Sequence, residues 1–151
     1  MKIPRLALLG AIVLMLAPLL GADEAQRASA FKFVDVFIDS HGKPLGAYQF
    51  ELRAAAGDVT LVGIEGGEHP AFAHPPYYDP KALLNQRVVI AAFNTGADDK
   101  LPAAKTRVAR LMVHVGRDVK PDYDVVLQVA ASSDAKPIDG AAISVSEGVA
   151  P

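Results

Sequence analysis

Two histidines and an aspartate within one short stretch are the side chains of this sequence that most resemble metal ligands. His69, His74 and Asp79 all lie between residues 66 and 87, and imidazole together with carboxylate can bind zinc. Their spacing matches no zinc template, and each of them is followed by a proline. The alternative is that they are exposed or hydrogen-bonded side chains, and we predict no metal site from them.

Acidic turns are the other metal candidates. Asp118, Asp122 and Asp124, or Asp98 with Asp99, can offer oxygens to a calcium ion. Neither set has the fixed glycine and the bidentate glutamate of an EF-hand loop. We therefore expect no cofactor, with a structural calcium ion as the alternative.

Catalytic groups are scarce. The chain has no cysteine and no Gly-x-Ser-x-Gly elbow, which removes the common nucleophile motifs. Hydrolysis by paired carboxylates needs two acids that converge in a cleft. Glu51 instead alternates outward on its strand, and Glu65 and Glu68 flank a glycine pair at the start of a loop. The sequence therefore predicts a protein that is not an enzyme.

Aromatic side chains make the stretch 66–87 the best candidate for a ligand-binding site. A connection this long is usually functional or disordered, and its aromatic content argues against disorder. Tyrosine combines an apolar ring with a hydroxyl, which suits both sugar stacking and protein interfaces. Four prolines stiffen the segment and lower the entropy lost on binding. The candidate ligand-binding residues are Phe72, His74, Tyr77, Tyr78 and Arg87.

The alternative for this loop is a structural one. Its rings can fold back and cap the hydrophobic core, with the prolines holding the lid in place. Both interpretations hold together if only one of the two tyrosines faces outward.

The first residues have the layout of a secretory signal peptide. Lys2 and Arg5 precede an apolar run over 6–20, and small residues follow up to Ala22. We expect cleavage after Ala22. The protein is then secreted or otherwise extracytoplasmic, in the periplasm, at the cell surface or outside the cell, with no stable membrane span.

The remainder is long enough for one domain with a real core. We expect a flexible lead-in over 23–30 and a single domain over 31–151. Loss of residues 1–22 removes two basic residues and leaves a charge of 13 − 17 = −4. A mildly acidic surface of mixed sign favours neither nucleic acid nor an anionic membrane as a partner.

Short strands separated by turns fill the domain. The clearest covers 47–53, where Tyr48, Phe50 and Leu52 alternate with polar residues. The apolar residues of 31–38 fall on both faces, which is typical of a strand covered on each side for part of its length. No helix of ordinary length is predicted, only one helical turn at 82–86. Further strands are predicted at 59–64, 88–93 (a continuous apolar run typical of a buried strand), 107–115, 122–131 and 142–146. The pattern predicts an all-β fold, an antiparallel, jelly-roll-like β-sandwich of about eight or nine short strands.

The order of these elements resembles that of bacterial cohesin-like domains. The run PLGAYQFELRAAAGDVTLVGIEGG is similar to the second and third strands of that family, and RVVIAAFNTG, TRVARLMVHV and DYDVVLQVAASSDAKPI are similar to its second half. The likeness covers about residues 31–147. It implies a jelly-roll sandwich of the kind shared with certain carbohydrate-binding modules.

These observations together predict a secreted, non-catalytic binding module. We expect it to recognise a protein partner through a sheet face or the long loop. One alternative is binding of an extracellular polysaccharide through Tyr77 and Tyr78, which the absence of tryptophan weakens. The other is a structural protein of the cell envelope or matrix that assembles through sheet edges or faces.

Overall fold

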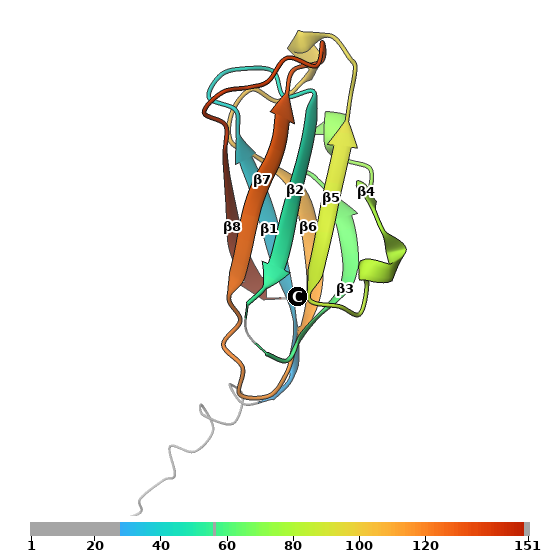
Figure 1. Cartoon of the computed structure of the whole chain (residues 1–151), viewed down its shortest axis with the longest axis vertical. Coiled ribbons are helices and arrows are strands. Elements are labelled where there is room, and N and C mark those ends of the chain that lie inside the picture. Colours follow the sequence, from blue (N-terminus) through green and yellow to red (C-terminus); the bar gives the residue numbers. More distant parts are fainter. Residues whose placement is uncertain (1–27, 56, 150–151) are drawn as a thin grey trace, which may run out of the picture.

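Two antiparallel four-stranded sheets face each other around an apolar core (Figure 1). The computed structural model describes residues 28–55 and 57–149. Sheet A has the strand order β3-β6-β1-β8 and sheet B the order β4-β5-β2-β7. The strands are β1 (Ala30–Asp39), β2 (Ala47–Ala54), β3 (Val59–Gly66), β4 (Tyr77–Tyr78), β5 (Arg87–Phe93), β6 (Thr106–Val115), β7 (Tyr123–Ala131) and β8 (Ala142–Val149).

This architecture confirms the predicted all-β sandwich. Every strand predicted from alternation is present, and the additional β4 falls inside the long connection. The predicted signal peptide lies outside the described residues. Within the described part of the chain, no helix is long and apolar enough to cross a membrane.

The core is built from the inward residues of both sheets. Val36 of β1, Phe50 of β2 and Leu111 of β6 are fully buried, because alternate residues of each strand point into the sandwich. Tyr48 is the buried aromatic with a polar group, and its hydroxyl donates to the Val108 carbonyl oxygen at 2.9 Å. That hydrogen bond joins β2 of sheet B to β6 of sheet A, so it also ties the two layers together.

The long connection crosses from sheet A to sheet B and closes one side of the sandwich. It contains the 3-10 turns η1 (Pro70–Phe72) and η2 (Pro80–Ala82), with β4 between them. Leu84 N donates to Leu61 O at 2.8 Å, and Leu61 N donates to Asn85 O at 2.9 Å, so the end of the connection pairs with β3. The helical turn predicted at 82–86 is wrong. The turn ends at Ala82, and Leu84 has a left-handed backbone with φ 65°.

On the outer face of sheet A, the structure differs from the prediction that the strand at 31–38 is covered on each side for part of its length. No second layer from the described residues covers the outer face of the strand predicted at 31–38. Cations cover it instead. The Arg110 guanidinium lies 5.0 Å from the ring centre of Phe33, and the Lys105 ammonium lies 5.2 Å from that of Phe37. Cation–π contacts of this kind shelter aromatic rings that stay partly in water.

An ion pair on the same face gives a pH-dependent prediction. Arg110 donates two hydrogen bonds to the Asp35 carboxylate, at 2.7 and 2.9 Å, and they hold the pKa of Asp35 below its ordinary value. The stability gained is present above the unfolded pKa of about 4 and is lost as the pH falls through the folded pKa. We expect Asp35→Asn to cost about 1 kcal/mol near neutral pH and progressively less below pH 4. Urea denaturation between pH 7 and pH 2 checks this, and Asp124→Asn is the control, because Asp124 forms no ion pair with another described residue. If the difference in free energy of unfolding between the wild type and Asp35→Asn stays constant with pH, the stabilising role of the Asp35–Arg110 pair is contradicted.

Candidate functional site

The outer face of sheet B is the surface that gathers most of the notable side chains. Residues directly opposite each other in an antiparallel sheet point to the same face. Because Tyr48, Phe50 and Leu52 point into the core, their neighbours along β2 point outward. Four cross-strand rows follow from the register: Phe93, Ala47 and Ala131; Tyr77, Ala91, Gln49 and Val129; Val89, Glu51 and Val126; and Arg87, Arg53 and Asp124.

One end of this face is aromatic and apolar. The rings of Tyr77 and Phe93 lie parallel, with centres 5.9 Å apart and an angle of 7° between their planes. Their exposed fractions are 67% and 65%, and Val126 and Val129 are also exposed. Among the described residues, only two other large hydrophobic side chains, Phe31 and Leu84, are comparably exposed. The exposed apolar surface is therefore concentrated on the outer face of sheet B.

The other end is charged but internally paired. Arg87 donates to both carboxylate oxygens of Glu51, at 2.8 and 2.7 Å, and Arg53 donates to one of them at 3.3 Å. These hydrogen bonds lower the pKa of Glu51 and raise the pKa of Arg87. Glu51 is thus a carboxylate held between two arginines. It is not a group prepared to transfer a proton near neutral pH.

An amide pair lies between the two ends. The side-chain nitrogen of Gln49 donates to the side-chain oxygen of Gln128 at 2.8 Å, across the β-bulge that separates Leu127 from Val129 in the register of β2 and β7. Gln128 is the extra residue of that bulge. Because Gln49 shares a cross-strand row with Tyr77 and Val129, the amide pair borders the aromatic rings on the side of the charged end.

The five residues predicted from the long loop do not form one surface. Phe72 is in the core, 4% exposed, with its ring edge against Tyr48 at a centre distance of 5.1 Å, so it belongs to no ligand surface. Tyr78 packs against the core and Tyr77 points outward, because adjacent residues of β4 face opposite ways. His74 is exposed in the loop, and Arg87 is on the outer face of sheet B. The structure thus brings Tyr77 and Arg87 to one face.

His69 and Asp79 have structural roles in the loop. The Nδ1 atom of His69 accepts from Ala71 N at 3.2 Å, and the carboxylate of Asp79 accepts from Lys81 N at 2.9 Å. Each residue caps a 3-10 turn whose first residue is a proline, an arrangement also preferred at helix starts. Across the part of the chain that the structure describes, no group of three or more His, Asp or Glu side chains could hold a metal ion.

Sequence reasoning missed the residues that share this face with Tyr77. The run 88–93 was expected to be buried, but β5 has one face toward the core and one toward solvent, so that prediction is wrong for Phe93. Simple alternation over 123–129 places Val129 on one face with Leu127 and Val126 on the other, and that prediction is wrong for Val129, because the bulge at Gln128 turns it outward. The sequence feature that could have found them is the alternation in β2. It shows which β2 residues point outward, and the residues of β5 and β7 that pair with them then point outward too.

No family model matches the chain, and no curated protein matches it.

Proposed function

We propose that this domain is a non-catalytic module that binds a protein partner through the outer face of sheet B. The observation that carries the proposal is the concentration of Tyr77, Phe93, Val126 and Val129 on that one face. Exposed apolar patches with a polar border are typical of interaction sites. Aromatic side chains are enriched at protein interfaces and often dominate their binding energy.

The charged end of the face supports the same proposal. The Arg87–Glu51–Arg53 network is already formed in the free protein, so little side-chain entropy is lost there on binding. The four charged groups of this end, counting Asp124, sum to zero. A partner with a neutral, apolar contact surface fits such a face better than a strongly charged one. The resemblance of the sequence to cohesin-like domains points to the same class of function.

Site-specific photo-crosslinking tests the proposal. A benzophenone amino acid replaces Phe93 on the outer face of sheet B or, as the matched control, Phe31, which is also exposed but lies on sheet A. In native extracts and culture medium we expect a protein crosslink from position 93 and none from position 31. Unlabelled wild-type protein should compete, whereas Val126→Lys/Val129→Lys should compete about tenfold less well, as expected for the centre of an interface. Phe31→Lys should compete as the wild type does.

Four outcomes would contradict the proposal. Equal crosslinking from both positions, or full competition by the double variant, would remove the outer face of sheet B as the interface. A crosslink only to a second copy of the chain would favour a structural assembly. Retardation of the wild type, but not of Tyr77→Ala, by a soluble polysaccharide in affinity electrophoresis would favour carbohydrate binding on the Tyr77–Phe93 ring pair.

A further inference from the structure

On one side of the sandwich, two strands end their sheets without a further strand from the described residues beside them. β7 and β8 run along the side opposite the long connection (Figure 1), and each is the last strand of its sheet. On the covered side, the connection hydrogen bonds to β3 at Leu61, and β4 pairs with β5. Open edges present unpaired backbone groups that can template pairing with another chain, and most proteins protect them.

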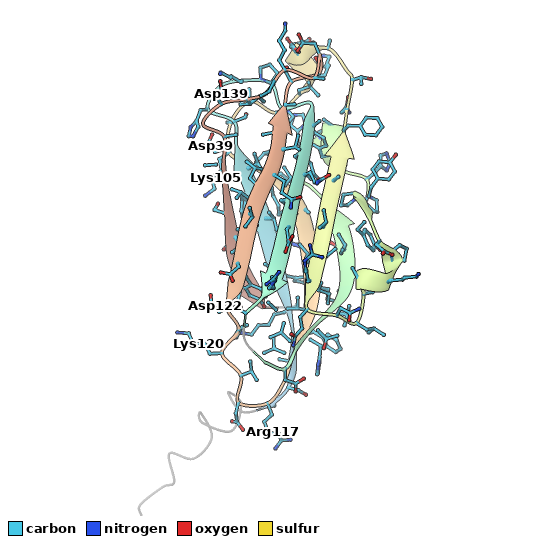
Figure 2. All side chains as sticks on the ribbon, viewed as in Figure 1. Asp39, Lys105, Arg117, Lys120, Asp122 and Asp139 are labelled. Carbon is cyan, nitrogen blue, oxygen red and sulfur yellow. The ribbon has the colours of Figure 1, made fainter. Side chains whose placement is uncertain are left out.

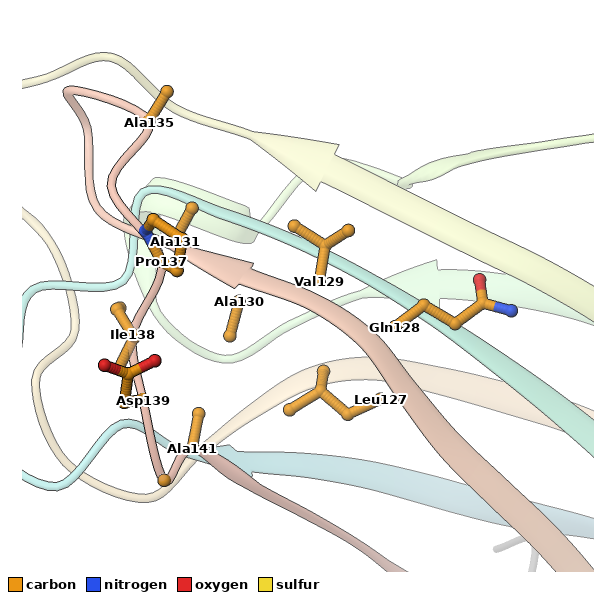
Figure 3. Close-up of a pocket in the computed structure, with 11 residues that line it drawn as sticks. Leu127, Gln128, Val129, Ala130, Ala131, Ala135, Pro137, Ile138, Asp139 and Ala141 are labelled. Atoms are coloured by element: carbon orange, nitrogen blue, oxygen red, sulfur yellow. The ribbon is translucent and has the colours of Figure 1, made fainter.

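The C-terminal half of the β7 edge is protected by the protein's own chain. Ile138 N donates to Ala130 O at 2.8 Å, and Pro137 forms an antiparallel bridge with Ala131. Ile138 is buried, and it lines the cleft between β7 and the connection to β8 (Figure 3). Leu127 and Ala130 point into this cleft, on the side of β7 opposite to Val129 (Figure 3). This part of the edge therefore already pairs with a short extended segment.

The N-terminal half of the same edge has no such cover from the residues that the structure describes. Asp122 O accepts from Ala55 N at 2.8 Å, so the peptide groups of Asp122 face β2. Because backbone groups alternate between the two sides of a strand, those of Tyr123, Val125 and Leu127 face away from β2. Tyr123 N donates to the Asp122 carboxylate at 3.0 Å. Within residues 28–55 and 57–149, the outward N–H and C=O of Val125 and the N–H of Leu127 find no backbone partner.

We propose that the β7 edge from Tyr123 to Leu127 binds an extended segment of a partner protein as an added antiparallel strand of sheet B. The protein's own Pro137–Ile138 segment indicates both the direction and the side chains that fit. It runs antiparallel to β7 and places an apolar side chain between the sheets. In strand addition the main-chain hydrogen bonds supply affinity, and alternate side chains supply specificity.

The charge of the β7 edge determines which outward-facing side chains the bound segment should carry. Asp122 and Asp124 flank Tyr123, and neither forms an ion pair with another described residue; nor does Lys120, the nearest lysine in sequence. Figure 2 places Asp122 at the end of β7 where the uncovered stretch begins. The segment that fits has apolar residues facing the sandwich and basic residues facing out, since opposite charges across a strand pair stabilise it.

A blocked heptapeptide of alternating lysine and isoleucine is the probe, titrated into 15N-labelled protein. We expect saturable shifts of the Val125 and Leu127 amides and slower hydrogen exchange at both. The same peptide N-methylated at alternate residues cannot form the ladder and should not bind. Asp124→Lys should weaken binding roughly five- to tenfold. Val125→Pro, which removes an outward N–H without touching the β2 ladder, should abolish it, and Tyr77→Ala/Phe93→Ala should leave it unchanged.

The last variant separates this proposal from the function proposed for the outer face of sheet B. If the double variant abolishes peptide binding, the peptide occupies that face and the edge proposal fails, while the face proposal gains support. Binding of the N-methylated peptide as tight as that of the unmethylated peptide would also overturn the edge proposal. Unchanged peptide binding by the Asp124→Lys variant would overturn it too, since that substitution leaves the β2 ladder intact. Absence of saturable binding up to about millimolar peptide, or a protein that dimerises with its Val125 and Leu127 amides already protected, would overturn it as well.

Discussion

Phe72→Ala should cost about 3–4 kcal/mol of the free energy of unfolding, which is typical for the truncation of a buried phenylalanine. Phe72 is the residue that anchors the long connection in the core, where its ring meets Tyr48 edge-on. Its backbone carbonyl also accepts from Gly67 N at 2.7 Å. Truncation therefore leaves a cavity beneath the connection and removes the main apolar contact of that segment. Urea denaturation followed by far-UV circular dichroism measures the loss.

Tyr77→Ala is the matched control within the same connection. Tyr77 is mostly in water and contacts Phe93 on the surface, so we expect a change within about 0.5 kcal/mol. Binding of the partner should follow the opposite order, with Tyr77→Ala weakening it strongly. Equal stability losses for the two variants would mean that Tyr77 is not presented to solvent as described.

Gly66→Ala should be destabilising by about 2–3 kcal/mol, the upper part of the range for overpacked sites. A Cβ at Gly66 would collide with the Ala73 carbonyl oxygen, and it would lie 2.6 Å from the His74 carbonyl oxygen. Both obstacles are backbone atoms, so no side-chain rotation can relieve the collision. The connection would have to move away from β3, carrying Phe72 with it. Thermal denaturation would show the loss, and hydrogen exchange would show faster opening over 67–78.

Gly148→Ala provides the comparison for this prediction. Gly148 lies in β8, and a Cβ there would meet no atom within 4 Å. Because glycine weakens a strand interior relative to alanine, we expect no loss and a gain of up to about 1 kcal/mol. If both substitutions cost the same, the effect would come from the strand backbone in general and not from the close approach at Gly66.

The sequence predicted the sandwich well because alternation is a local property. In β2, Tyr48, Phe50 and Leu52 fall on one side of any extended strand, so their burial follows from the pattern alone. The caps in the long connection, where His69 and Asp79 precede prolines, are equally local, although they were not predicted as caps. Such features depend on neighbours within a few residues.

The composition of the candidate site was harder to predict because it depends on pairing between distant strands. Phe93 meets Tyr77 only because β4 pairs with β5, and a two-residue strand leaves almost no alternation to detect. The bulge at Gln128 shifts the register of β7 by one residue, which decides whether Val129 faces water or the core. Phe72 and Tyr77 look alike in sequence. Only their three-dimensional surroundings show that Phe72 anchors the connection in the core and that Tyr77 is exposed on the proposed interface.

The position of β1 in sheet A constrains the order in which the protein can fold. Among the described strands β1 comes first in sequence, yet it lies between β6 and β8, which are two of the last three. Contacts so distant in sequence make folding slow, because a long loop must close before they form. A ribosome still synthesising β8 holds a chain whose strand β1 has one vacant edge, so sheet A can be completed only after β8 has been made. Truncation before Ala142 should therefore leave the apolar strand β1 exposed along its length and prone to aggregation.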